Sequence, residues 1–106
     1  MSIAVYSAQQ TQQLFDLFSA MTDYYAGDPA RINHFVKVHA YARQIGLAEQ
    51  LDADTLFLLE AAALTHDIGI REAERLYGQC SGKLQERLGP PEAQKMLDSL
   101  GFAPDV

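Results

Sequence analysis

The sequence predicts an all-α fold, a compact bundle of about five helices. Three observations indicate this. Apolar residues recur at helical spacing along most of the 106-residue chain. Residue types that begin and end helices flank those segments. No segment of useful length shows the period-two alternation of a strand. At this length the chain is expected to form a single domain, residues 1–106.

The first predicted helix begins at about Ser7 and ends before Ala26. Ser7 and Gln10 have the spacing of a capping box, in which each side chain bonds to the other residue's backbone N–H. The apolar residues that share one helical face are Leu14, Leu17, Phe18, Met21 and Tyr25.

The second predicted helix runs from Pro29 to about Ile45. Asp28 fits the N-cap, and Pro29 fits the first helical position, where no N–H is needed. Gly46 is the expected stop. His34 lies at the edge of the expected inward stripe, which consists of Phe35, Val38, Ala42 and Ile45.

A third helix is predicted to open at Asp52 or Asp54. It is apolar nearly all the way round except at Glu60, which is typical of a central helix. Its last turn carries His66 and Asp67, which we therefore expect to be delivered into the interior. An unpaired buried carboxylate is costly, so Asp67 should have a cationic or N–H partner.

Two more helices complete the prediction. A short helix spans Ile70 to Tyr77, and a small polar loop spans Gly78 to Lys83. The last helix is predicted to begin at Gly89-Pro90 and to stop at Gly101. Its inward face consists of Ala93, Met96, Leu97 and Leu100.

Composition excludes several classes of protein. Hydrophobic residues make up 48% and charged residues 21%, which is ordinary for a globular protein. Eight Lys and Arg stand against fourteen Asp and Glu, so no broad basic surface is expected for duplex nucleic acid. No apolar run approaches the roughly 20 residues that cross a bilayer, and no signal peptide precedes the first helix. We expect a cytoplasmic protein with no membrane partner.

His66 and Asp67 are good ligands for a divalent metal ion. The alternative is structural: Asp67 caps a neighbouring helix, and His66 donates to a backbone carbonyl. His34 favours the metal, because a short connection between antiparallel helices can bring it level with the doublet. His39 competes with His34 but lies about 140° around the helix from it. We expect His34 to be the ligand and His39 to be a core or surface residue.

His34, followed on the next helix by the run EAAALTHDIG at residues 60–69, resembles the HD-domain metal-dependent phosphohydrolases, which are all-α proteins. The likeness continues through residues 77–78, 82–86 and 89–91. It implies a divalent ion (Mn, Mg, Fe, Co or Zn) held by His34, His66 and Asp67, with Asp67 as the catalytic residue. The implied reaction is hydrolysis of a small phosphorylated metabolite or nucleotide.

An acidic protein that binds an anionic substrate needs local cations. Arg71, Lys83 and Arg87 follow the His-Asp doublet and are the candidate substrate-binding residues, with solvated surface charge as the alternative. Glu86 is a candidate acceptor behind the metal ligands, or an exposed residue at the start of a helix.

The family pattern closes with a further Asp on a later helix, and neither Asp98 nor Asp105 matches that position. We therefore expect the N-terminal portion of a longer HD-type protein. Its uncovered apolar helix faces predict a homo-oligomer.

The alternative function is a non-catalytic HD-like helical module that binds a ligand or regulates a partner. A di-iron centre for oxygen chemistry is a third reading, and it needs more ligands than the chain offers.

Overall fold

The computed structural model describes residues 5–68 and 82–102, with the side chains of 82–86 left out. This part of the chain holds four helices and no strand: α1 (Ala8–Tyr24), α2 (Pro29–Ala48), α3 (Ala53–Thr65) and α5 (Gly82–Ser99). The all-α class is therefore confirmed for the described residues. The helix predicted at 70–77 lies outside them, as do Cys80 and most of the 78–83 loop.

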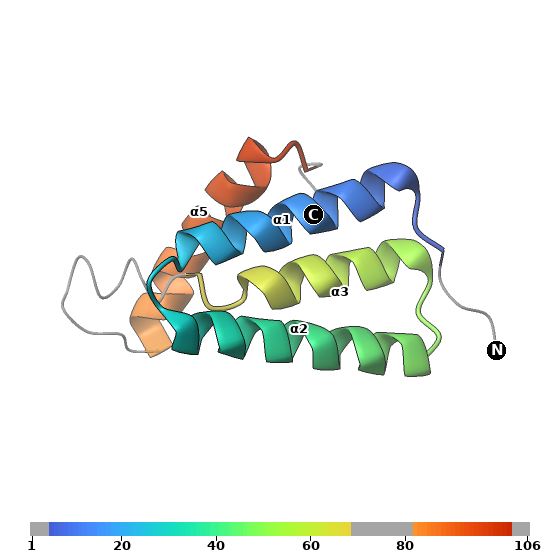
Figure 1. The fold of residues 1–106 in the computed structure, drawn as a ribbon, viewed down its shortest axis with the longest axis horizontal. Coiled ribbons are helices and arrows are strands. Elements are labelled where there is room, and N and C mark those ends of the chain that lie inside the picture. Colours follow the sequence, from blue (N-terminus) through green and yellow to red (C-terminus); the bar gives the residue numbers. More distant parts are fainter. Residues whose placement is uncertain (1–4, 69–81, 103–106) are drawn as a thin grey trace.

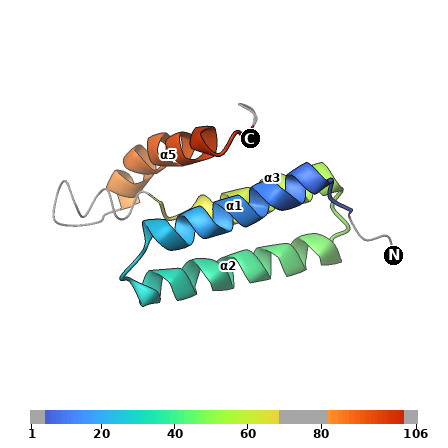
Figure 2. The same ribbon diagram turned by 45° about the horizontal axis from the view of Figure 1, so that its top comes forward.

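Helix α2 runs antiparallel to α1, and α3 runs antiparallel to α2. In Figure 1, α3 lies between the other two. Helix α3 packs against both α2 and α1, and α5 packs against α1. Figure 2 shows α5 on the side of α1 that is away from α2. The start of α2 and the end of α3 consequently lie at the same end of the helix layer.

The predicted starts of the first three helices are confirmed by their capping bonds. Ser7 Oγ accepts the N–H of Gln10 at 3.1 Å, and Gln10 Oε1 accepts the N–H of Ser7 at 3.0 Å. Asp28 caps α2 with Pro29 in its first turn, and Asp52 caps α3. Each cap of this kind stabilises a helix by about 1 kcal/mol.

The predicted stop of α2 at Gly46 is wrong. The helix continues to Ala48 and ends two residues before Gln50, whose φ is +58°. The N–H groups of Gln50 and Leu51 bond back to the carbonyls of Leu47 and Gly46 at 3.1 Å each. This pair of bonds is a Schellman motif with a non-glycine residue in the left-handed position.

Gly46 instead allows α2 to pack closely against α3. It is buried, and a Cβ atom placed there would lie 2.6 Å from Cδ1 of Leu56 and 3.1 Å from Cδ2 of Leu59. The missing side chain therefore lets α2 approach α3 more closely than any other residue would allow.

The inward stripe predicted for α2 is also partly wrong. Phe35 is 2% exposed and belongs to the core, but Ile45 is 61% exposed. The buried residues of α2 are Phe35 and Gly46, three turns apart, and Ile45 points about 100° away from Gly46. Ile32 and Val36 complete the core-facing side.

The core is shared by all four helices and by the segments that follow α3 and α5. Phe57 and Phe102 stack with ring centroids 5.5 Å apart. The inward face predicted for the last helix is confirmed, because Ala93, Met96, Leu97 and Leu100 pack against the core. The buried apolar cluster consists of Leu17, Met21, Tyr25, Phe35, Phe57, Ala61, Leu64, Ile68 and Phe102.

The predicted start of the last helix at Gly89-Pro90 is wrong. Helix α5 begins at Gly82, and Pro90 and Pro91 lie inside it. A proline favours the first helical turn because it lacks an N–H, but here both prolines lie in the interior of the helix. The predicted stop at Gly101 is confirmed, with φ at +77° and the N–H of Phe102 bonded back to the last turn.

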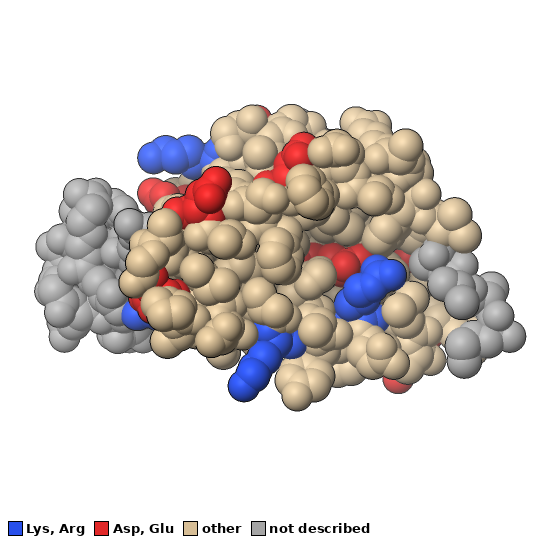
Figure 3. Space-filling model, in the orientation of Figure 1, with Lys and Arg blue, Asp and Glu red and all other residues tan. Residues whose placement is uncertain are grey.

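Several large apolar side chains of the described part are exposed, on α1, α2, α3 and the segment before α1: Val5, Phe15, Tyr41, Ile45 and Leu58. On the face in Figure 3, Lys and Arg side chains are scattered rather than gathered into a basic patch. None of the helices described is long and apolar enough to span a membrane.

We predict that Gly46→Ala lowers the free energy of unfolding by about 1–3 kcal/mol, because the new methyl group overlaps the buried Leu56 side chain. At an exposed helical site the same change would stabilise by up to about 1 kcal/mol. Urea denaturation measures the difference. In a Leu56→Ala background, which removes the overlapping atom, the added methyl should cost less. A stabilised Gly46→Ala protein would contradict the close approach of α2 and α3.

Candidate metal centre

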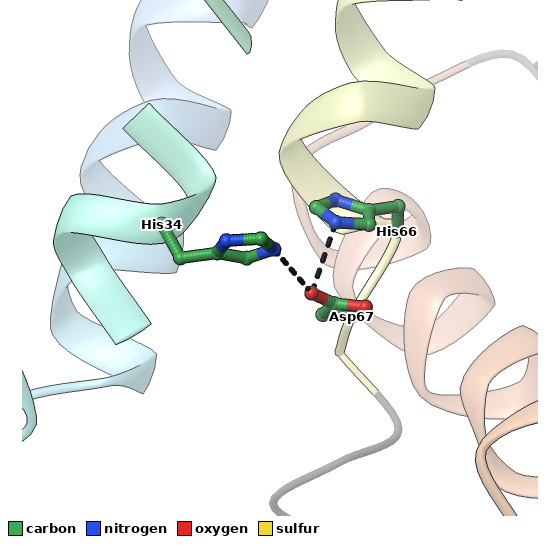
Figure 4. Close-up of side chains that lie close together, drawn as sticks. All are labelled: His34, His66 and Asp67. Carbon is green, nitrogen blue, oxygen red and sulfur yellow. Dashed lines mark ion pairs between the residues drawn. The ribbon is translucent and has the colours of Figure 1, made fainter. Parts of the chain in front are cut away.

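Three of the predicted side chains meet where the start of α2 faces the end of α3 (Figure 4). His34 lies in the second turn of α2, His66 is the C-cap of α3, and Asp67 follows it. Asp67 Oδ2 lies 3.0 Å from Nε2 of His34 and 2.9 Å from Nε2 of His66. Both imidazoles therefore point at one carboxylate oxygen.

The other ring nitrogen of His66 has a backbone partner. Nδ1 lies 2.7 Å from the carbonyl oxygen of Ala63, one turn earlier in α3. A carbonyl can only accept, so Nδ1 carries a proton and donates it. In the neutral ring Nε2 then presents a lone pair towards Asp67 Oδ2, so the contact needs a proton or a metal cation between the two atoms.

Two of the three separations between ligand atoms match those of neighbouring ligands on one ion. The ligand atoms of His34, His66 and Asp67 all lie within 4.8 Å of one another. Neighbouring ligands held at about 2.0–2.2 Å from one ion lie about 2.8–3.6 Å apart in octahedral or tetrahedral geometry. The two nitrogen–oxygen distances of 2.9 and 3.0 Å lie within that range. Two imidazole nitrogens and one carboxylate oxygen, with the His66 tautomer fixed by its backbone partner, thus suit a divalent cation.

The site is not interior, contrary to the sequence prediction. The exposed side-chain fractions are 58% for His34, 33% for His66 and 20% for Asp67. Helix α3 ends at Thr65, so the doublet lies in the turn beyond it and reaches the surface. An ion bound by side chains this exposed would keep coordination positions that another molecule can reach.

A cavity of about 300 Å³ adjoins the centre. Its polar lining includes His34, Asp67 and an ion pair between Arg31 Nε and Asp28 Oδ2 at 3.1 Å. Its apolar lining consists of Tyr25, Ala30 and Phe35. The volume is at the small end for ligand pockets, which favours a small molecule.

His39 belongs to a different cluster, centred on Glu60. The Glu60 side chain is 3% exposed; its Oε1 contacts His39 Nε2 at 2.8 Å, and its Oε2 contacts Arg43 at 2.9 Å and accepts a hydrogen bond from the Tyr6 hydroxyl. His39 is partly buried beside Glu60 and lies outside the His34 cluster. That His34 rather than His39 is a metal ligand stays a prediction. The sequence did not reveal Glu60 as the partner of His39.

Burial acts to raise the pKa of Glu60, but hydrogen bonds from His39 and Tyr6, together with the charge of Arg43, outweigh it and lower the pKa below its ordinary value. Burial and the neighbouring carboxylate raise the pKa of the Tyr6 hydroxyl. Glu60 is therefore an ionised carboxylate that joins α2, α3 and the segment before α1.

The residues predicted to bind substrate are not part of the described centre. Arg71 lies outside the described residues, as does the side chain of Lys83. The side chain of Glu86, predicted as an acceptor behind the metal ligands, is also outside them. Arg87 is exposed on α5 and does not line the cavity. Among the described residues, the cationic side chain that lines the cavity beside the centre is Arg31, which was not among the predicted substrate-binding residues. Its position one helical turn before His34 was the available signal.

No protein-family model, curated protein or solved structure matches the chain. The resemblance to HD-domain proteins therefore stays a prediction from the residues themselves.

We predict that Glu60→Gln lowers the free energy of unfolding at pH 7 by about 1–3 kcal/mol, because His39 and Arg43 lose a charged acceptor. The folded pKa of Glu60 is below its ordinary 4.5, so its stabilisation is complete above about pH 5 and is lost as the pH falls through the folded pKa. Urea denaturation from pH 7 to pH 3 should show the two proteins converging. The exposed Glu49→Gln serves as control, and a constant difference at all pH values would refute the assignment.

Proposed function

We propose that the protein is a metal-dependent phosphohydrolase of the HD type that acts on a small phosphorylated metabolite or nucleotide. The observation that carries the proposal is the convergence of His34 and His66 on Asp67, with the His66 tautomer set by the carbonyl of Ala63. A backbone acceptor behind a metal-ligating histidine is the usual arrangement in metalloproteins.

His34, His66 and Asp67 would hold the ion. A divalent cation supplies Lewis acidity, which makes water more acidic and polarises phosphoryl oxygens. The carboxylate of Asp67 is also the candidate catalytic group, since both imidazoles point at it and it lines the cavity. The partial exposure of all three side chains leaves room for a phosphate to approach.

Arg31 is our candidate for binding the phosphate. Its guanidinium carries five N–H donors in a planar fork, so one arginine can hold Asp28 and an anion together. It lines the same cavity as His34 and Asp67. Tyr25 and Phe35 form an apolar wall suited to a compact organic group, and the volume suits a small ester better than a polymer.

The second candidate is a non-catalytic helical module. It is favoured by one observation: Asp67 and the two histidines can satisfy one another as ion pairs once an imidazole is protonated. In this case the cluster stabilises the contact between α2 and the end of α3, and no metal is needed.

Metal binding separates the two functions. We expect one Mn²⁺ or Co²⁺ per chain in isothermal titration calorimetry, with affinity reduced at least about tenfold in His34→Gln and Asp67→Asn, because each loses a ligand. The control is Lys37→Gln, an exposed residue of the same helix that does not line the cavity. Its metal affinity should equal that of the wild type. Failure of the wild type to bind any divalent ion would contradict the metal centre.

Hydrolysis tests the reaction class. With Mn²⁺, Mg²⁺ or Co²⁺ added, generic phosphomonoesters and nucleoside monophosphates should be hydrolysed in an Asp67-dependent manner. Arg31→Gln should raise KM about tenfold or more without changing metal affinity, because it removes a charged hydrogen-bond donor from the cavity. Arg87→Gln, on α5 outside the cavity lining, is the control. Equal KM values in all three proteins would exclude Arg31 as the phosphate-binding residue.

A further inference from the structure

Two consecutive tyrosines at the end of α1 bond to the segment that carries the metal ligands. The hydroxyl of Tyr25 donates to the carbonyl of Asp67 at 2.8 Å, and the hydroxyl of Tyr24 donates to the carbonyl of Ile68 at 3.1 Å. Both carbonyls lie beyond Thr65, the last residue of α3, and the two tyrosines supply donors for them.

The bond from Tyr25 has a direct geometric consequence for the site. It holds the peptide group of Asp67 itself, and the orientation of that peptide determines where the carboxylate of Asp67 can reach. The bond from Tyr24 holds the next residue, Ile68, which carries no ligand atom and is buried in the core. The two hydroxyls thus make similar bonds with different relations to the centre.

Tyr25 also contacts the helix that carries the third ligand. Its ring lies 6.0 Å, centroid to centroid, from the ring of Phe35, which directly follows His34 in α2. Tyr25 is 3% exposed and forms part of the cavity wall. One side chain of α1 therefore touches both segments that contribute ligands, at the residue beside His34 and at Asp67.

We propose that Tyr25 is a positioning residue for the metal centre, a role that rests on the proposed metal binding by His34, His66 and Asp67. Its hydroxyl holds the Asp67 peptide and its ring packs against Phe35, so the carboxylate and the His34 imidazole keep the spacing that one cation requires. Partners behind metal ligands typically contribute about 10–100-fold in metal affinity.

The test compares Tyr25→Phe with Tyr24→Phe, each of which loses one hydroxyl and one hydrogen bond to a carbonyl. Thermal unfolding monitored by circular dichroism should show similar losses of Tm. Titration with Mn²⁺ in a calorimeter should show affinity reduced about tenfold in Tyr25→Phe and unchanged in Tyr24→Phe. The visible spectrum of bound Co²⁺, which reports ligand geometry, should change only in Tyr25→Phe.

A rescue keeps the test independent of folding. Incorporation of 4-aminophenylalanine in place of Tyr25 retains a donor at the ring tip and should restore Mn²⁺ affinity. Wild-type affinity in Tyr25→Phe, or equal losses in both phenylalanine variants, would overturn the positioning role while leaving the metal centre intact. Absence of Mn²⁺ and Co²⁺ binding by the wild type would instead overturn the metal centre, and the positioning role with it.

Discussion

The antiparallel contact between α2 and α3 determines where the candidate functional side chains lie. At one end of the pair, Gly46 has no side chain and lets Leu56 approach its backbone. In the middle, the buried carboxylate of Glu60 binds two side chains of α2. At the other end, His34 meets Asp67. A shift of one residue along either helix moves atoms by about 1.5 Å, enough to break the bonds to Glu60. The polar cluster and the close glycine contact therefore favour the register that brings His34, His66 and Asp67 together.

That register explains why the candidate centre is compact although its ligands come from a helix and a turn. His66 and Asp67 lie just beyond the end of α3, where the backbone has left the helix and its carbonyls need new partners. Those partners come from α1, through Tyr24 and Tyr25. Tyr25 also lines the cavity that adjoins His34 and Asp67. A candidate centre whose backbone is held by hydrogen bonds and whose side chains reach a cavity could keep its geometry and still admit a ligand.

The local features of the fold were predictable, and the features set by distant contacts were not. The starts of α1, α2 and α3 follow from capping side chains within a few residues, so the sequence located them well. Gly46 was misread as a stop because a glycine that permits close packing resembles one that ends a helix, and the true left-handed residue is Gln50. Pro90 was misread as a helix start because proline is typical of the first helical turn, whereas here it lies inside α5. In the site, the lengths of the two helices predicted that His34, His66 and Asp67 would meet, but the hydrogen bond from Tyr25 joins residues 42 positions apart and leaves no local signal.

The most direct test of the metal centre is anomalous diffraction from crystals of the protein grown with Mn²⁺. The account predicts one strong anomalous peak beside Asp67 Oδ2 and the Nε2 atoms of His34 and His66, at about 2.0–2.3 Å from each. The His66 Nδ1 contact with the carbonyl of Ala63 should persist, because it sets the tautomer that binds. Density showing the two histidines in direct contact with Asp67, with no anomalous peak at millimolar Mn²⁺, would contradict the metal centre and favour the non-catalytic module.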